Sequence, residues 1–80
     1  MTENEIRTKL NETFRDVFDD QTLEITPEMT AADVEEWDSL SHISLIVAVE
    51  KAFRVRFTTG EVQALANVGD FLALIGSKVR

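Results

Sequence analysis

The amino-acid sequence predicts an all-α domain: a four-helix bundle of three main helices and one short helix. Apolar residues recur at three- and four-residue steps in several segments, which is the spacing of one helix face. The one β-like run, Val55-Arg56-Phe57, is too short to predict a strand. The chain has 80 residues, enough for one domain over residues 1–80 and not for two.

The first helix is predicted close to the N-terminus. Thr2 is a suitable N-cap, and Glu3 and Glu5 would lie near the positive end of the helix dipole. The Asp-Asp-Gln run at 19–21 then ends the pattern. The residues that repeat at helical spacing are Ile6, Leu10, Phe14, Val17 and Phe18.

Residues 19–38 are predicted to form a long loop. Pro27 lacks a backbone donor and disfavours helix at Thr26. Structureless loops of this length are uncommon in small domains and are often functional. Its scattered apolar residues, which would anchor it to the core, are Leu23, Ile25, Met29 and Val34.

A second helix is predicted from Asp38 or Ser39 to about Arg54, with Asp38 as its N-cap. This helix is apolar on two sides. The stripe formed by Leu40, Ile43 and Val47 lies nearly opposite the broader arc. Either the stripe is exposed as a partner surface, or the long loop folds back and covers it. The broader arc, predicted to face the core, contains Leu45, Ile46, Val49, Ala52 and Phe53.

The rest of the chain predicts a turn at residues 58–61 and two further helices. The short helix that follows the turn would carry Val62, Leu65 and Ala66 on one face. The run 67–70 (Asn-Val-Gly-Asp) is expected to interrupt it. The last helix would carry Phe71, Leu72, Ile75 and Val79 on one stripe.

The composition is acidic, with 15 Asp+Glu against 8 Lys+Arg and a formal charge of −7. No Lys or Arg lies between Arg15 and Lys51. Such a surface repels phosphate backbones and favours basic proteins, so nucleic acid is not an expected partner. The charged N-terminal segment does not resemble a secretory signal, and no apolar run is long enough for a bilayer. We therefore expect a soluble, cytoplasmic protein without membrane contact.

Ser39 is the main candidate for a functional residue. By position it is an ordinary first-turn serine, but a phosphodiester attached there would lie beside free backbone N–H groups and the positive helix end. Trp37 is expected to pack on the loop or core. His42, three residues after Ser39, is expected to be a solvated surface residue, since a hydrolase would also need an oriented base and an oxyanion hole. With no cysteine and one histidine, no metal site is predicted.

The tripeptide Asp38-Ser39-Leu40 resembles the D-S-L motif of acyl and peptidyl carrier proteins. The run EEWDSLSHISLIVAVEKAF at 35–53 is similar to the family pattern, in which an apolar-rich helix ends in Glu-x-x-Phe. The loop TPEMTAADVEEWDSL and the segment NVGDFLALI resemble the approach to the motif and the start of the last helix. The resemblance covers essentially the whole chain.

The resemblance implies a single acyl-carrier domain that is not an enzyme, a phosphoprotein with 4′-phosphopantetheine covalently attached to Ser39. The thiol of that arm would hold an acyl or aminoacyl group as a thioester. The implied partners are a phosphopantetheinyl transferase, a loading synthetase and downstream acyltransferases. The carrier itself is expected to be a monomer. The implied docking residues are Asp38, Leu40, Ile43, Val47 and Glu50.

The sequence also departs from the fatty-acid carriers, which usually have several acidic residues along this helix. Here Ser41, His42 and Ser44 lie early on it, and Lys51 and Arg54 lie near its end. These departures make a specialised stand-alone carrier at least as plausible as a housekeeping fatty-acid carrier. The pathway would be fatty acid, polyketide or nonribosomal peptide biosynthesis. The alternative function is an unmodified acidic interaction module that docks through Leu40, Ile43 and Val47.

Overall fold

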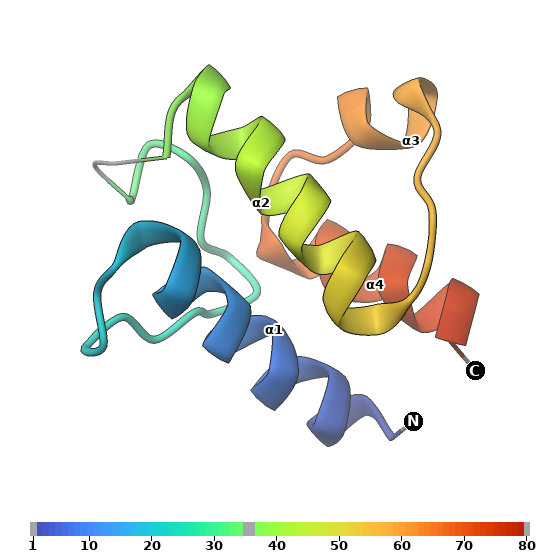
Figure 1. The fold of residues 1–80 in the computed structure, drawn as a ribbon, viewed down its shortest axis with the longest axis horizontal. Coiled ribbons are helices and arrows are strands. Elements are labelled where there is room, and N and C mark those ends of the chain that lie inside the picture. The colour runs from blue at the N-terminus through green and yellow to red at the C-terminus, as the bar shows by residue number, and fades with distance from the viewer. Residues whose placement is uncertain (1, 35–36, 80) are drawn as a thin grey trace.

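The fold was obtained as a computed structural model that describes residues 2–34 and 37–79. Within this part of the chain the fold is all-α, with three long helices and one short one, as predicted. Helices α1 and α2 lie side by side and run in opposite directions, α4 lies partly behind α2, and α3 lies to one side (Figure 1). The helices are α1 (Glu3–Phe18), α2 (Ser39–Phe53), α3 (Thr59–Gln63) and α4 (Val68–Val79).

Helix α1 begins with a capping box. The Thr2 hydroxyl accepts a hydrogen bond from the Glu5 backbone N–H (3.2 Å), and the Glu5 carboxylate accepts one from the Thr2 N–H (3.0 Å). The helix ends where Asp19 takes the left-handed conformation with φ of 51°. The predicted face is confirmed, except that Val17 is only half-buried. Its buried members are Ile6, Leu10, Phe14 and Phe18.

The core is centred on Phe14, whose ring contacts three other aromatic rings. Trp37 meets Phe14 edge-on with ring centroids 5.3 Å apart, and Phe18 and Phe71 lie at 5.8 and 6.3 Å. Helix α2 contributes the buried side chains of Leu45, Val49 and Phe53 from its predicted core arc. Because Trp37 belongs to the long loop, this cluster ties that loop to α1 and α4.

The first half of the long loop is held at several points. The Ile25 backbone N–H donates to Asn11 Oδ1 (2.8 Å), and Arg15 Nε donates to the Leu23 carbonyl (2.6 Å). The start of α4 is bound as well, because the Gly69 N–H donates to the Pro27 carbonyl at 2.8 Å. A Cβ at position 69 would lie 3.1 Å from that oxygen, so glycine permits this close approach.

Two boundaries in the C-terminal part differ from the sequence prediction. Helix α3 ends at Gln63, so Leu65 and Ala66 belong to the connection that follows it. Helix α4 begins at Val68, inside the run that was expected to interrupt helical structure. The reason is that Asn67 Oδ1 accepts a hydrogen bond from the Asp70 backbone N–H (2.8 Å) and so caps the helix.

The buried position of Phe53 yields a stability prediction. Phe53 is 7% exposed and lies at the end of the α2 core arc, with Lys9 Nζ 5.5 Å from its ring centroid. We expect Phe53→Ala to lower the free energy of unfolding by about 3–5 kcal/mol, since it leaves a cavity. Urea unfolding followed by circular dichroism measures this, with Val47→Ala on the exposed stripe as the control. A Phe53→Ala midpoint close to that of the control would contradict the assigned faces of α2.

Candidate functional site

The start of α2 is fixed by Asp38, as predicted. Its Oδ1 accepts a hydrogen bond from the Ser41 backbone N–H at 2.9 Å, and its carbonyl accepts one from the His42 N–H at 2.8 Å. The bond from the Ser41 backbone is the main cause that lowers the pKa of the Asp38 carboxyl. Ser39 is the first helical residue, and its side chain lies outside what the structure describes.

The outer side of α2 carries an exposed apolar stripe. Leu40 is 76% exposed, Ile43 63% and Val47 44%, while the core arc on the opposite side is buried except for the half-buried Ala52. The described part of the long loop therefore does not cover the stripe, and that alternative is wrong. Exposed apolar side chains next to each other on one helix face are typical of a partner surface.

A groove of about 470 Å³ lies beside the start of α2. It is formed where the long loop, the first turns of α2 and the connection between α3 and α4 meet. Most of the lining is apolar, and its one described charged side chain is that of Asp38. The residues that line it are Ala31, Trp37, Asp38, His42, Leu65 and Ala66.

Trp37 and His42 form a pair on one wall of this groove. Trp37 Nε1 donates a hydrogen bond to His42 Nδ1 at 3.0 Å, and the two rings stack with centroids 6.0 Å apart at 23°. His42 is half-buried, so the expectation of a solvated surface residue is wrong. Burial lowers the pKa of His42 below its ordinary value, because the protonated imidazole loses water contacts.

Trp37 itself is buried, with 8% of its surface exposed. The predicted packing on the core and loop is confirmed by its edge contact with Phe14 and its contact with Phe18 at 6.4 Å between centroids. The indole thus joins the core to His42. Sequence reasoning missed this pair because its members stand five residues apart, on opposite sides of a helix start.

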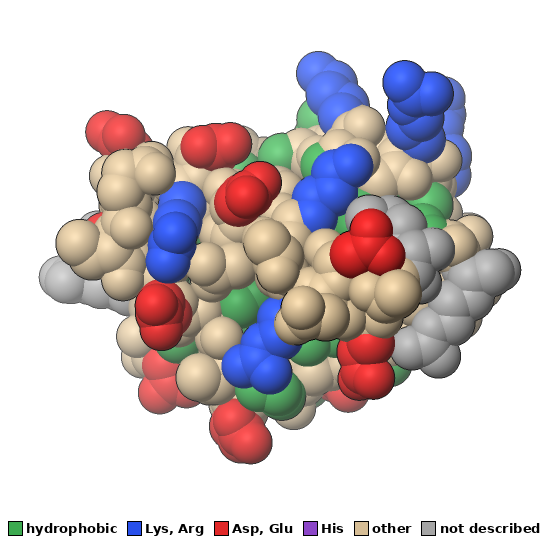
Figure 2. All heavy atoms as spheres, turned by 90° about the horizontal axis from the view of Figure 1, so that it is seen from below, with side chains coloured by type: hydrophobic (Ala, Val, Ile, Leu, Met, Phe, Trp, Pro, Cys, Tyr) green, Lys and Arg blue, Asp and Glu red, His purple; other side chains and the backbone are tan. Residues whose placement is uncertain are grey.

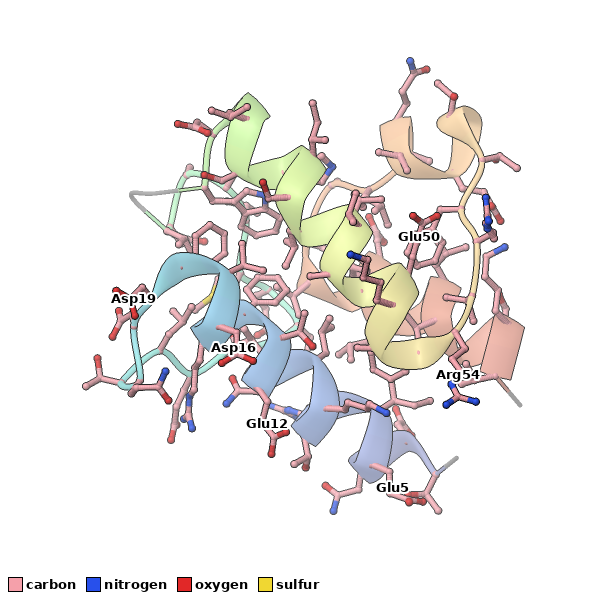
Figure 3. The ribbon with its side chains drawn as sticks, in the orientation of Figure 1. Glu5, Glu12, Asp16, Asp19, Glu50 and Arg54 are labelled. Atoms are coloured by element: carbon pink, nitrogen blue, oxygen red, sulfur yellow. The ribbon has the colours of Figure 1, made fainter. Side chains whose placement is uncertain are left out.

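Glu50, expected among the docking residues, also has an internal partner. Its carboxylate Oε2 accepts a hydrogen bond from the Phe57 backbone N–H at 2.9 Å, and the side chain is half-buried. Figure 3 shows Glu50 lying toward the segment that follows α2, with Arg54 at the end of the helix. Glu50 therefore holds this connecting segment, and its substitution would change more than surface charge.

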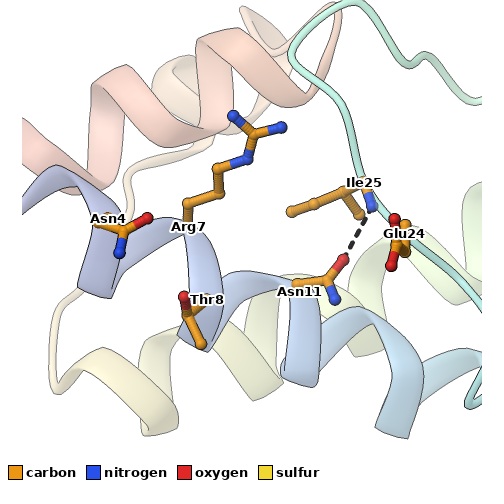
Figure 4. A pocket seen from close by; sticks show the side chains of 6 residues that line it. All are labelled: Asn4, Arg7, Thr8, Asn11, Glu24 and Ile25. Carbon is orange, nitrogen blue, oxygen red and sulfur yellow. Dashed lines mark hydrogen bonds between the residues drawn. The ribbon is translucent and has the colours of Figure 1, made fainter.

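A second hollow, of about 250 Å³, lies between α1 and the loop (Figure 4). Its lining is polar, and the Asn11 side chain on its wall is engaged by the Ile25 backbone N–H. The residues drawn there are Asn4, Arg7, Thr8, Asn11, Glu24 and Ile25. None offers a nucleophile with a paired base, and we assign this hollow to loop anchoring.

The remaining surface does not point to another chemistry. The face in Figure 2 carries acidic and basic side chains near one another, with apolar side chains in small patches. Among residues 2–34 and 37–79, no three histidine or acidic side chains are grouped as a metal site would need. Over the same residues, no helix is long and apolar enough to cross a membrane.

Comparisons with known proteins agree on one family. The chain is 35% identical over 77 residues, 96% of this chain and 92% of the relative, to an acyl carrier protein of Acidothermus cellulolyticus. It is 32% identical to an acyl carrier protein of Thermosynechococcus vestitus, over 99% of this chain and 98% of that one. A meromycolate extension acyl carrier protein of Mycolicibacterium smegmatis is 32% identical over 92% of this chain and 75% of its own.

The fold is also similar to a solved structure. The solution structure of holo acyl carrier protein from Geobacter metallireducens superposes with a TM-score of 0.82 at 46% identity, covering 86% of this chain and 79% of that one. The all-α, acyl-carrier-like fold predicted from the sequence is thereby confirmed. No protein-family model matches the chain.

The lowered pKa of His42 predicts a loss of stability in acid. As the pH falls through 6.5, the ordinary value, the unfolded chain takes up a proton at His42 that the folded chain does not yet bind. The free energy of unfolding therefore falls with pH in this window. Urea midpoints of the wild type and His42→Gln between about pH 8 and about pH 5 isolate the effect. Parallel curves for the two proteins would show that His42 is not responsible.

Proposed function

This chain belongs to the acyl carrier protein family, and we propose that it bears a 4′-phosphopantetheine arm on Ser39. Like its relatives, the protein is a carrier and not an enzyme. The arm supplies a thiol, which holds the cargo as a thioester. Because the chain contains no cysteine, no thiol of its own competes with that of the arm.

The observation that supports this proposal best is where the D-S-L tripeptide lies. Ser39 is the first residue of α2, next to an exposed N-cap and an exposed Leu40. A transferase can reach such a backbone position without unfolding the domain. The serine oxygen would form the phosphodiester, while its proton and the nucleotide half of coenzyme A would leave.

The residues beside Ser39 fit the arm. A pantetheine chain has two amides, a branched apolar carbon and a flexible end, so it suits a groove that is mostly apolar with a few polar groups. The groove offers apolar contact from Ala31, Leu65 and Ala66, and polar atoms from His42. We propose that these residues hold the arm between transfers.

The exposed stripe is proposed as the docking surface for partner enzymes. Leu40, Ile43 and Val47 would enter an apolar partner surface, with the carboxylates of Asp38 and Glu50 at the rim. The end of α2 differs in charge, because the groove of about 460 Å³ there is lined by Lys51, Arg54 and Arg56 against one carboxylate, that of Glu50. A complementary partner would therefore present acidic groups opposite this end.

This charge distribution favours a specialised carrier with dedicated partners over a housekeeping one. The proposed partners are a phosphopantetheinyl transferase, a loading synthetase and downstream acyltransferases. The cargo can be a fatty acyl, hydroxyacyl or aminoacyl group, and no described residue selects among them. A cytoplasmic location and a monomeric state stay predictions. The alternative of an unmodified interaction module is not favoured, since a similar solved structure is a holo carrier.

The attachment site is tested by Ser39→Ala. We expect this variant to take up no label from coenzyme A with a promiscuous phosphopantetheinyl transferase, because the acceptor oxygen is gone. Its circular dichroism should match the wild type, since the Asp38 cap remains. Intact mass and peptide mapping measure the modification. Ser41→Ala is the matched control and should label normally. Label that remains on Ser39→Ala, or that maps to Ser41 or Ser44, would overturn the proposal.

The docking surface is tested by Val47→Asp. The new carboxylate would stay in water in the free carrier but would be desolvated against an apolar partner. We expect transferase kcat/KM to fall by about tenfold or more, which is about 1.4 kcal/mol. Ala73→Asp, on the exposed side of α4, is the control with the same added charge. A folded Val47→Asp carrier that is modified at the wild-type rate would remove the stripe as a docking surface.

A further inference from the structure

A phosphodiester on Ser39 would find one backbone donor of the first turn already in use. The Asp38 carboxylate accepts the Ser41 N–H at 2.9 Å, so this cap competes for the groups that make helix starts attractive to anions. The same carboxylate would place a second negative charge beside the phosphate. The phosphate would therefore gain from a further donor near Ser39.

That donor is His42 Nε2. An indole Nε1–H can only donate, so the ring nitrogen that it contacts must be unprotonated. Because Trp37 Nε1 contacts His42 Nδ1 at 3.0 Å, the neutral imidazole carries its proton on Nε2. Trp37 is itself packed against Phe14, so both the tautomer and the ring plane of His42 are set by the core.

His42 Nε2 is also available to a ligand. Among the described residues its hydrogen bond is made at Nδ1, and the half-buried side chain leaves part of the ring exposed. His42 lines the groove and stands three residues after Ser39 on α2, a spacing that puts two positions on one helix side. His42 therefore lies on the side of α2 that carries the proposed attachment point.

We propose that His42 binds the phosphate at the base of the arm, its Nε2–H donating to a phosphodiester oxygen, with Trp37 as the positioning residue that fixes the imidazole. This inference rests on the proposed attachment at Ser39. Protonation of His42 would add an ion pair to this contact, and it would end the Trp37 hydrogen bond, because the protonated Nδ1 can no longer accept. Asp38 is the one other charged side chain among the described groove residues.

Nuclear magnetic resonance of the arm-bearing protein tests this directly. A phosphodiester does not titrate near neutral pH, so an inflection in its ³¹P shift between about pH 5 and about pH 8 would report His42. We expect that inflection to share its midpoint with the His42 ring protons. We also expect the pKa of His42 to be higher by about half a unit or more than in the unmodified protein. A ³¹P signal that does not titrate, or equal His42 pKa values in both forms, would overturn the proposal.

Two variants separate the roles. His42→Gln keeps an amide N–H donor but cannot titrate, so its ³¹P shift should be constant with pH. Trp37→Phe keeps a ring in the core but removes the donor to Nδ1, and the rise in the His42 pKa on modification should then shrink. Proton–nitrogen correlations on the unmodified wild type must show the Nε2–H tautomer, and the other tautomer would refute the role of Trp37.

If intact mass shows that no arm is attached at Ser39, the proposed function fails. If the arm is attached and the ³¹P signal does not respond to pH, the inference about His42 fails and the carrier function stands. The two failures are therefore distinguishable in one sample.

Discussion

The packing of α2 on the Phe14 cluster decides what the rest of the molecule can do. Helix α2 is apolar on two sides, and a domain of 80 residues buries too little surface to cover both. Leu45, Val49 and Phe53 are buried on the inner side. Once they are placed, the rotation of α2 is fixed, and the stripe that begins at Leu40 must face outward. The surface proposed for docking is thus a consequence of core packing.

The same cluster also sets the start of α2, where the attachment site is proposed. Trp37 is anchored on Phe14, so the residue two positions before Ser39 cannot move independently of the core. Asp38 then caps the helix through Ser41 N–H. A rigid residue before the site and a capped helix after it would present Ser39 at a constant position. The long loop before the site is also held in place, by the hydrogen bond from Ile25 N–H to Asn11 and by the hydrogen bond from Gly69 N–H of α4 to the Pro27 carbonyl.

Much of this could be predicted from sequence because the deciding signals are local. The face of α1 and the caps at Thr2 and Asp38 follow from spacing and side-chain chemistry, and the structure confirms them. The start of α4 could not be predicted, because Gly69 is typical of a break until its contact with the Pro27 carbonyl is known. The exposure of the stripe could not be settled from the sequence either, because it requires, besides the core packing of α2, that the long loop run elsewhere. The burial of His42 could not be predicted either, because it depends on Trp37, which lies outside its helix.

We propose above all that the arm is attached at Ser39 and lies in the groove beside it, leaving the docking stripe free. Amide and indole N–H shifts compared between the unmodified and the arm-bearing protein test this most directly. We expect the changes to concentrate at the Trp37 indole, the first turn of α2, and Leu65 and Ala66, with little change at Ile43 and Val47. Changes centred on Ile43 and Val47, or an undisturbed Trp37 indole, would contradict it.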